Sequence, residues 1–296
     1  MGASLEEMAR SCLEMAKVAD AVVVLTGQMA SKEETDAVWR QNMQMLLDLA
    51  PGVTFGVYEC PEPYHRVLEP ETLAWVASSG RFSFFKDTSR DCDLITQKLT
   101  ALRNAPQPTS NSWKLRWYNG NCATLLHSLR EGADGFSGVF ANFYPFMAVH
   151  LVNWHTIDPE AAERIQSFLS VAEMTVKHKY PQSAKVYLRR QYKINIEPAC
   201  RTSQFSPWLS EELLRLDHLG ALMGTVAQAE TISKVAPPLR SPSRPSPKPS
   251  PKSPTSPPFS PASTVTSTPA SPPARAATSP PRLRPDQLIG PNRTPH

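Results

Sequence analysis

The sequence predicts an α/β fold built on a parallel sheet. Short β-branched and aromatic runs alternate with helical patterns through most of residues 1–236, and this alternation is typical of parallel β/α units. Several runs are almost continuously apolar, such as Ala-Val-Val-Val-Leu at 21–25 and Phe-Ser-Phe-Phe at 82–85, as expected for strands buried on both faces. The five predicted strands are 21–25, 53–58, 81–86, 114–118 and 135–140.

The helices have readable starts. Capping boxes, in which a hydroxyl precedes a carboxylate by three residues, are predicted at Ser4 with Glu7 and at Ser31 with Glu34. Prolines in a first helical turn are predicted at Pro70 and, after an Asp158 cap, at Pro159. After the fifth strand we expect helices near 159–178, 184–192 and 207–233, and a loop that contains His150 and His155.

Composition changes abruptly near residue 235. Residues 237–296 hold 19 of the chain's 30 prolines, eight Lys and Arg, and one acid, Asp286. No apolar core can form from such a segment, so we predict a disordered basic tail. Residues 1–236 carry 23 basic and 26 acidic groups, a globular composition, and at this length the body buries roughly 70% of its unfolded surface.

Several classes are disfavoured by the sequence. It has no run of about 18 apolar residues and no signal-peptide pattern at its start, so we expect a cytoplasmic protein that does not contact membranes. Its five cysteines lack the spacing of a zinc site, which predicts reduced thiols and no metal. No G-x-G-x-x-G follows a strand, which removes the main support for a dinucleotide site. An open doubly wound sheet and a closed (β/α)₈ barrel both remain.

Polar residues follow the predicted strands, at the edge where parallel β/α folds place their working groups. Lys86 directly follows an apolar strand, where desolvation lowers the pKa of an amine and favours Schiff-base chemistry. Tyr58 ends the neighbouring strand and could move protons. The alternatives are a lysine that extends to water or pairs with Asp87, and a tyrosine packed on a loop.

Four motifs in order resemble the dihydrodipicolinate synthase and N-acetylneuraminate lyase family. They are Tyr-Glu-Cys-Pro at 58–61, Phe-Lys-Asp-Thr-Ser at 85–89, Gly-Asn at 120–121 and Gly-Ala-Asp-Gly-Phe-Ser-Gly-Val-Phe-Ala-Asn at 132–142. The resemblance implies a TIM barrel whose first three β/α units are absent, with units 4–8 at 1–158, a C-terminal helical region at 159–236 and the tail at 237–296.

The resemblance also implies a class I aldolase, a lyase that needs no cofactor. Lys86 resembles the Schiff-base lysine and Tyr58 the catalytic tyrosine, and the expected substrates are a 2-oxo acid such as pyruvate and an aldehyde. Residues that match substrate-binding or pocket-lining positions of the family are Thr26, Gly120, Asn121 and Ser137.

Departures from the family pattern leave activity open. The family's upstream Gly-Thr-Thr-Gly-Glu-like segment is absent, Thr26 is followed by Gly-Gln-Met instead of Pro-Tyr-Tyr, and Pro63 stands where many members carry a substrate-binding arginine. Arg66 lies three residues further on, and whether it takes that role is left open. Either the chain is an incomplete gene product, which we favour, or it folds only with another chain that supplies the first three units; the complete form is expected to be a homo-oligomer.

A second hypothesis is a catalytically inactive barrel remnant that acts as an interaction or scaffold protein. Ser-Pro and Thr-Pro pairs recur through the tail and suit proline-directed kinases or SH3- and WW-type domains. Weak contacts with nucleic acid are the less favoured alternative, and a linker without a partner is the simplest reading.

Overall fold

The computed structural model describes residues 4–106, 114–201, 206–230 and 232. These residues all fall within one compact unit, Met1–Arg240. The tail predicted at 237–296, with its expected disorder and partners, lies outside the described residues.

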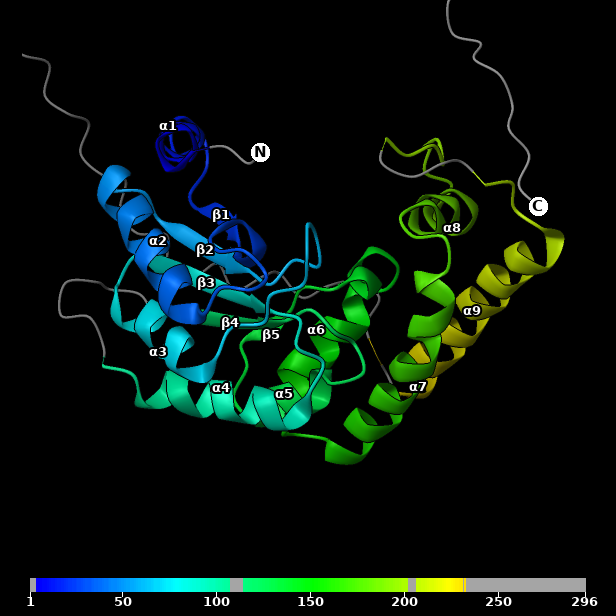
Figure 1. Ribbon diagram of the computed structural model, residues 1–296. Helices are drawn as coiled ribbons and strands as arrows, with labels where there is room; N and C mark the ends of the chain where they lie inside the picture. The colour runs from blue at the N-terminus through cyan, green and yellow to red at the C-terminus, as the bar shows by residue number, and fades with distance from the viewer. Residues whose placement is uncertain (1–3, 107–113, 202–205, 231, 233–296) are drawn as a thin grey trace, which may run out of the picture. The chain divides into compact units, whose positions relative to one another are not determined.

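One sheet of five parallel strands is present in the described part of the chain (Figure 1). Its strands are β1 (Val22–Leu25), β2 (Phe55–Tyr58), β3 (Phe82–Asp87), β4 (Arg116–Asn119) and β5 (Gly135–Phe136). They lie side by side in sequence order, whereas strand order reverses in a doubly wound sheet. Among the described strands the order therefore favours the sheet of a barrel over an open doubly wound sheet.

Helices connect the strands. The segments before β5 are α1 (Leu5–Met15), the short η1 (Thr26–Gln28), α2 (Asp36–Leu49), α3 (Pro70–Ser78), α4 (Cys92–Asn104) and α5 (Leu125–Arg130). Helix α1 packs on α2, and α3 packs along α4. Crossovers between parallel strands are almost always right-handed, so a sequential order places the connecting helices on one face of the sheet, as α2, α3 and α4 lie in Figure 1.

The helix-covered face of the sheet carries the first hydrophobic core. Phe55, Phe85 and Trp117 come from three neighbouring strands and are fully buried, and they belong to the same cluster as Trp39 of α2. Successive strand residues point to opposite faces. The other face is more open, since Val23 of β1 is 45% exposed.

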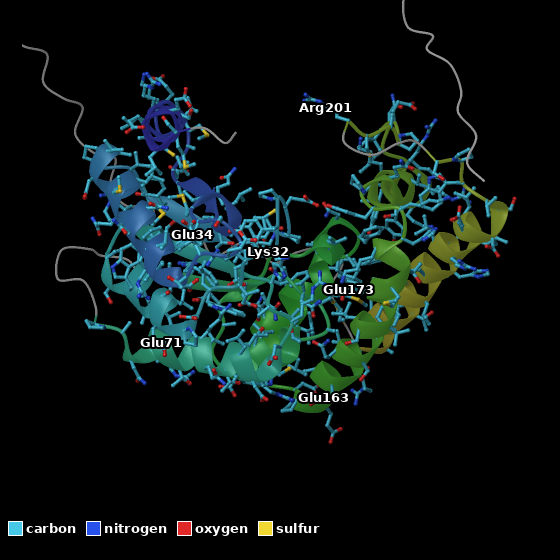
Figure 2. All side chains as sticks on the ribbon, viewed as in Figure 1. Lys32, Glu34, Glu71, Glu163, Glu173 and Arg201 are labelled. Carbon is cyan, nitrogen blue, oxygen red and sulfur yellow. The ribbon has the colours of Figure 1, made fainter. Side chains whose placement is uncertain are left out.

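The chain is helical after β5. The segments are η2 (Val139–Asn142), α6 (Pro145–Trp154), α7 (Pro159–Lys177), α8 (Gln182–Tyr192) and α9 (Ser210–Ala229), which share a second apolar cluster that includes Phe143, Leu169 and Tyr187. Glu173 of α7, labelled in Figure 2, accepts a hydrogen bond of 3.4 Å from the backbone N–H of Cys122. This bond ties α7 to the loop after β4.

Most predicted elements are confirmed. All five strands occur, and α1 begins with the predicted Ser4 and Glu7 capping box. Pro70 opens α3, and the side chain of Asp158 accepts a hydrogen bond from the backbone N–H of Ala161 at the start of α7.

Three predictions differ from the structure. Residues 135–140 were expected to form one strand, but β5 ends at Phe136 and a 3-10 turn buries Phe140. The predicted loop around His150 and His155 is helix α6 and its C-cap. The sequence does not predict this helix, because the helix is apolar around most of its surface and so shows little helical periodicity. Helix α2 begins at Asp36, five residues after Ser31.

None of the helices in the described ranges is both long and apolar enough to cross a membrane.

Candidate active site

Tyr58 and Lys86 meet at the carboxyl ends of β2 and β3. The two residues are partners in the register of the sheet, and register partners on adjacent parallel strands point to the same face. Lys86 Nζ lies 3.9 Å from the centroid of the Tyr58 ring, and both side chains are half-buried. The two residues that the sequence singled out are therefore in contact.

Burial changes the acid-base properties of both groups. Desolvation lowers the pKa of the Lys86 amine, with the nearby Cys60 opposing the shift. The Tyr58 ring face also opposes it, because an aromatic face attracts a cation. Desolvation raises the pKa of Tyr58 to about 12, with smaller contributions from Cys60 and Tyr180. The amine is neutral more often than an exposed lysine, and the phenol keeps its proton at neutral pH.

Two neighbours of this pair were missed by the sequence analysis. Cys60 is partly buried beside both groups, and its backbone N–H donates to the Tyr58 carbonyl at 2.8 Å. Tyr118 of β4 is the register partner of Lys86 on the other side. Lys86 is thus flanked in the sheet by two tyrosines, and strand register alone would have revealed the second.

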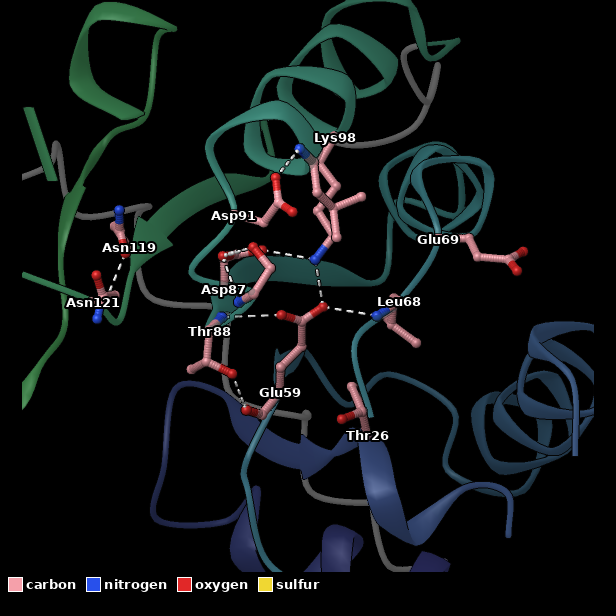
Figure 3. Close-up of polar contacts among 12 residues, drawn as sticks. Thr26, Glu59, Leu68, Glu69, Asp87, Thr88, Asp91, Lys98, Asn119 and Asn121 are labelled. Atoms are coloured by element: carbon pink, nitrogen blue, oxygen red, sulfur yellow. Dashed lines mark hydrogen bonds and ion pairs between the residues drawn. The ribbon is translucent and has the colours of Figure 1, made fainter. Parts of the chain in front are cut away.

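Tyr58 and Lys86 are each followed in the sequence by a carboxylate of a buried ion cluster (Figure 3). Lys98 Nζ of α4 lies 2.6 Å from Glu59 Oε1 and 2.7 Å from Asp87 Oδ2, and none of the three side chains is exposed. Asp87 therefore pairs with Lys98, so the alternative that it pairs with Lys86 is wrong. Removing one partner of such a cluster costs about 3–5 kcal/mol, since it leaves a buried charge unpaired.

Backbone groups complete the cluster. Glu59 Oε1 accepts from the Leu68 N–H at 2.8 Å, and Oε2 accepts from the Thr88 N–H at 3.0 Å. Asp87 Oδ1 accepts from the N–H and the hydroxyl of Ser89 at 3.0 and 2.7 Å. These bonds fix the segments that follow β2 and β3.

Two carboxylates share one ammonium in this cluster. Burial raises the pKa of Glu59 to about 7, opposed by Lys98 and reinforced by Asp87. Burial alone would lower the pKa of Lys98, but the two carboxylates outweigh it and the pKa is raised. Near neutral pH the cluster therefore exchanges a proton at Glu59 while Lys98 stays charged.

The sequence contained an unused signal for this cluster. Lys98 occupies a position of α4 that falls among the buried residues Ile95, Leu99 and Leu102, so it interrupts an apolar stripe with a charge. Buried lysines require carboxylate partners, and both partners directly follow predicted site residues in the sequence.

Gly120 lies against Lys86. A Cβ atom at this position would be 2.7 Å from the Asp87 carbonyl oxygen and 3.4 Å from Lys86 Cε, so only glycine fits without a shift. Ser137 is exposed, and its backbone N–H donates to the Asn119 carbonyl at 2.8 Å. The assignment of both residues to substrate binding stays a prediction.

Thr26 and Asn121 are buried and already bonded. The Thr26 hydroxyl donates to the Arg66 carbonyl at 2.8 Å. Asn121 Oδ1 accepts from the Thr124 N–H at 3.2 Å, and the Asn121 N–H donates to Asn119 Oδ1 at 2.7 Å. In this arrangement both side chains hold loops, and their contacts with substrate stay a prediction.

Arg66, the suggested substitute for the family's substrate-binding arginine, has another set of partners. Its guanidinium lies 2.9 Å from Asp36 Oδ1 and donates to the carbonyls of Ser31 and Glu34 at 2.6 Å each. Both members of the pair are more than 90% buried. Arg66 therefore joins the segment after β2 to the start of α2.

Comparisons with known proteins place this site in a known fold. No family model and no curated protein sequence matches the chain. A monomeric dihydrodipicolinate synthase variant superposes with a TM-score of 0.62 at 20% identity, over 75% of this chain and 71% of that one. Dihydrodipicolinate synthase from Thermotoga maritima gives 0.59 at 18% identity, over 77% and 72%.

A second kind of enzyme is equally similar in structure. A variant of 2-keto-3-deoxygluconate aldolase from Sulfolobus solfataricus superposes with a TM-score of 0.60 at 14% identity, over 79% of this chain and 75% of that one. The resemblance stated from the sequence is thus confirmed in the fold: the chain has the parallel β/α architecture of these enzymes. At identities of 14–20% these superpositions show that the fold is shared, and they do not show that the activity is.

Proposed function

We propose that this chain is a Schiff-base-forming lyase of the class I aldolase type. Its substrate is a 2-oxo acid such as pyruvate, which it joins to an aldehyde or releases from the joined product. Lys86 is the nucleophile and Tyr58 the proton shuttle. The observation that carries the proposal is the 3.9 Å approach of Lys86 Nζ to the Tyr58 ring at the carboxyl edge of the sheet.

The reaction begins with the neutral amine. Lys86 Nζ attacks the carbonyl carbon of the 2-oxo acid and forms a carbinolamine, and the carbinolamine oxygen then leaves as water after taking a proton from Tyr58. The Tyr58 phenolate left by this step takes a C3 proton from the protonated imine, which gives an enamine. The enamine attacks the aldehyde carbon, and the aldehyde oxygen takes the proton back from Tyr58. Water then hydrolyses the new protonated imine, which frees the Lys86 amine and the product and returns a proton to Tyr58.

The environment of the pair suits both steps. Burial lowers the pKa of Lys86, which increases the neutral fraction that attacks. Tyr58, whose pKa is raised to about 12, is protonated at neutral pH and lies close enough to donate to the leaving hydroxyl. The protonated imine itself is the electron sink, so the proposal requires no cofactor.

Borohydride trapping tests the proposal. Incubation with pyruvate and sodium borohydride should reduce the imine to a stable secondary amine, visible as a mass increase of the intact protein. We expect the increase in the unmodified protein and its loss in Lys86→Ala. Lys17→Ala is the matched control, because Lys17 is exposed and paired with Glu14.

The outcomes are distinct. A mass increase that survives in Lys86→Ala, or that is lost equally in Lys17→Ala, would contradict the assignment of Lys86. The absence of an adduct over a series of 2-oxo acids would contradict the lyase.

The second candidate function is that of an interaction or scaffold protein. Val171 and Met174 lie about one turn apart on α7 and are 75% and 76% exposed, and exposed apolar pairs of this kind occur at protein interfaces. This candidate predicts no adduct with any 2-oxo acid. We also propose kinase, SH3-type or WW-type partners for the tail, and homo-oligomer formation.

A further inference from the structure

The buried ion cluster and the proposed catalytic pair are linked through the backbone. Tyr58 precedes Glu59, and Lys86 precedes Asp87. Consecutive residues of an extended segment point to opposite sides, which is what the burial shows: Tyr58 and Lys86 are half-buried, whereas Glu59 and Asp87 are fully buried beside α4. Each member of the pair therefore has one carboxylate of the cluster directly behind it.

Lys98 joins these two carboxylates. Its Nζ reaches Glu59 at 2.6 Å and Asp87 at 2.7 Å, so a single ammonium spans the ends of β2 and β3 (Figure 3). Thr88 adds a second link between the same segments, because its N–H donates to Glu59 Oε2 at 3.0 Å and its hydroxyl donates to the Glu59 carbonyl at 2.5 Å. The separation of the two strand ends is thus set by side chains at the ends of β2 and β3 and by Lys98 of α4.

A contribution to stability does not by itself explain why these three buried positions carry charged residues. Well-packed apolar residues in place of a buried ion cluster are often neutral or stabilising, and α4 already supplies an apolar stripe around Lys98. What an ion cluster supplies is fixed geometry, since short charged hydrogen bonds tolerate little displacement. Reaction rates are sensitive to displacements of this size, with a shift of 1 Å costing roughly 100-fold.

We propose that Lys98 is a positioning residue of the Schiff-base site: by holding Glu59 and Asp87 it fixes the distance between the Tyr58 phenol and the Lys86 amine. The inference rests on the proposed function, because it assigns the purpose of the cluster to that pair. It acts through backbone position, and Lys98 itself does not touch the substrate.

The test compares two cluster variants. Lys98→Met leaves two buried carboxylates without a cation and can fail to fold. The triple variant Glu59→Gln, Asp87→Asn, Lys98→Met keeps the side-chain sizes and removes all three charges, so it avoids that failure. Glu230→Gln is the control, since it breaks a different ion pair, between the C-cap of α9 and the exposed Arg164 of α7, and touches neither the strand ends nor the cluster.

The measured quantity is the rate of pyruvate trapping by borohydride per folded molecule, as a function of pyruvate concentration. In the folded triple variant we expect the maximal rate to fall roughly 10- to 100-fold, with the half-saturating concentration changed less than threefold. In Glu230→Gln we expect the maximal rate to stay within twofold of the unmodified protein. A folded triple variant whose maximal rate stays within twofold overturns the inference.

A second measurement separates this inference from the proposed function. Acetic anhydride acetylates neutral amines, and mass spectrometry gives the rate at Lys86 relative to Lys17 in the same molecule, with no substrate present. If the unmodified protein forms no pyruvate adduct, the proposed lyase function is wrong. The positioning role of Lys98 is then judged from the acetylation rates. A relative rate at Lys86 that differs at least fivefold in the triple variant supports positioning, and an unchanged ratio refutes it.

Discussion

At the scale of residues, Lys86 illustrates how a fold sets the reactivity of one amine. Partial burial lowers its pKa, while the face of the Tyr58 ring 3.9 Å away favours the charged form. The ring also gives the amine a fixed place, and the phenol, with a pKa of about 12, carries the proton that imine formation consumes. The same contact therefore holds the nucleophile and supplies the acid.

The Tyr58→Phe variant separates these two contributions. It keeps the ring face beside Lys86 and removes the hydroxyl, so we expect the fold and the position of Lys86 to be preserved. The rate of pyruvate trapping should fall by about 10²- to 10⁴-fold, the usual contribution of a general acid or base. The rate is measured by adding borohydride at a series of times after pyruvate and determining the mass of the intact protein.

The matched control is Tyr192→Phe. Tyr192 ends α8 and is 50% exposed, so the loss of its hydroxyl should leave the trapping rate unchanged. Equal rates in Tyr58→Phe and Tyr192→Phe would remove the phenol from the mechanism.

At the scale of elements, β2 and β3 behave as a matched pair. The half-buried residue of the proposed site is the last residue of β2 and the last but one of β3, and the next residue in each case is a carboxylate that binds Lys98 of α4. The helix that packs behind the strands thus also fixes their ends. Its own start is fixed by the Asp91 side chain, which accepts from the Leu94 N–H at 3.0 Å.

The pH dependence of stability tests the cluster. The folded protein holds a proton on Glu59 up to about pH 7, whereas an ordinary glutamate loses it near pH 4.5. Between these values Glu59 binds more protons in the folded state than in the unfolded state, so its contribution to the free energy of unfolding should fall as pH rises, by up to about 3 kcal/mol. Glu59→Gln cannot lose this proton and should show a flatter profile.

Urea unfolding at pH 5, 6 and 7 measures the effect. Glu14→Gln is the control, because the Glu14 side chain is 71% exposed, and it should retain the slope of the unmodified protein. A Glu59→Gln variant with the same slope as the unmodified protein would contradict the assigned protonation, because His65 and His150, whose pKa values are lowered by desolvation, contribute equally to both profiles.

Most helices and strands could be predicted from the sequence, but the buried ion cluster around Lys98 could not. Strand periodicity located all five strands, and the spacing of Ser4 and Glu7 located a helix start, because these signals depend on neighbours in sequence. Lys98 pairs with residues 39 and 11 positions away, and only the packing of α4 on the sheet brings them together. Helix α6 was missed since its apolar sequence lacks a polar face.

At the scale of the whole molecule, the sequential order of the strands organises the site. Because β1 to β5 lie in order and run parallel, all their carboxyl ends reach one edge, and residues from β2, β3 and the segment after β4 meet there. The sequence placed these groups on a common edge, and the resemblance to dihydrodipicolinate synthases assigned their roles. The assignment of roles stays a prediction that chemistry must test.

Truncation tests the independence of the body from the tail. Ile232 still packs in the second core cluster and its N–H donates to the Ala227 carbonyl at 2.8 Å, so the cut must follow it. A chain that ends at Arg240, the boundary of the compact unit, should keep its melting temperature within about 2 °C and its trapping rate within twofold. A chain that ends before Ile232 should be less stable.

Calorimetry and borohydride trapping on the two truncated chains provide the measurement. A large loss of stability or trapping in the longer chain would show that residues after 240 belong to the working unit.

Peptide mapping of the reduced pyruvate adduct is the most direct test of the central claim. After borohydride reduction and proteolysis, tandem mass spectrometry locates the modified lysine. The account predicts that the added mass lies on Lys86 alone. It also predicts that an excess of a pyruvate analogue that lacks the keto group adds no mass. Modification of Lys98 or of exposed lysines such as Lys17 in place of Lys86, or the absence of any modified lysine, would contradict it.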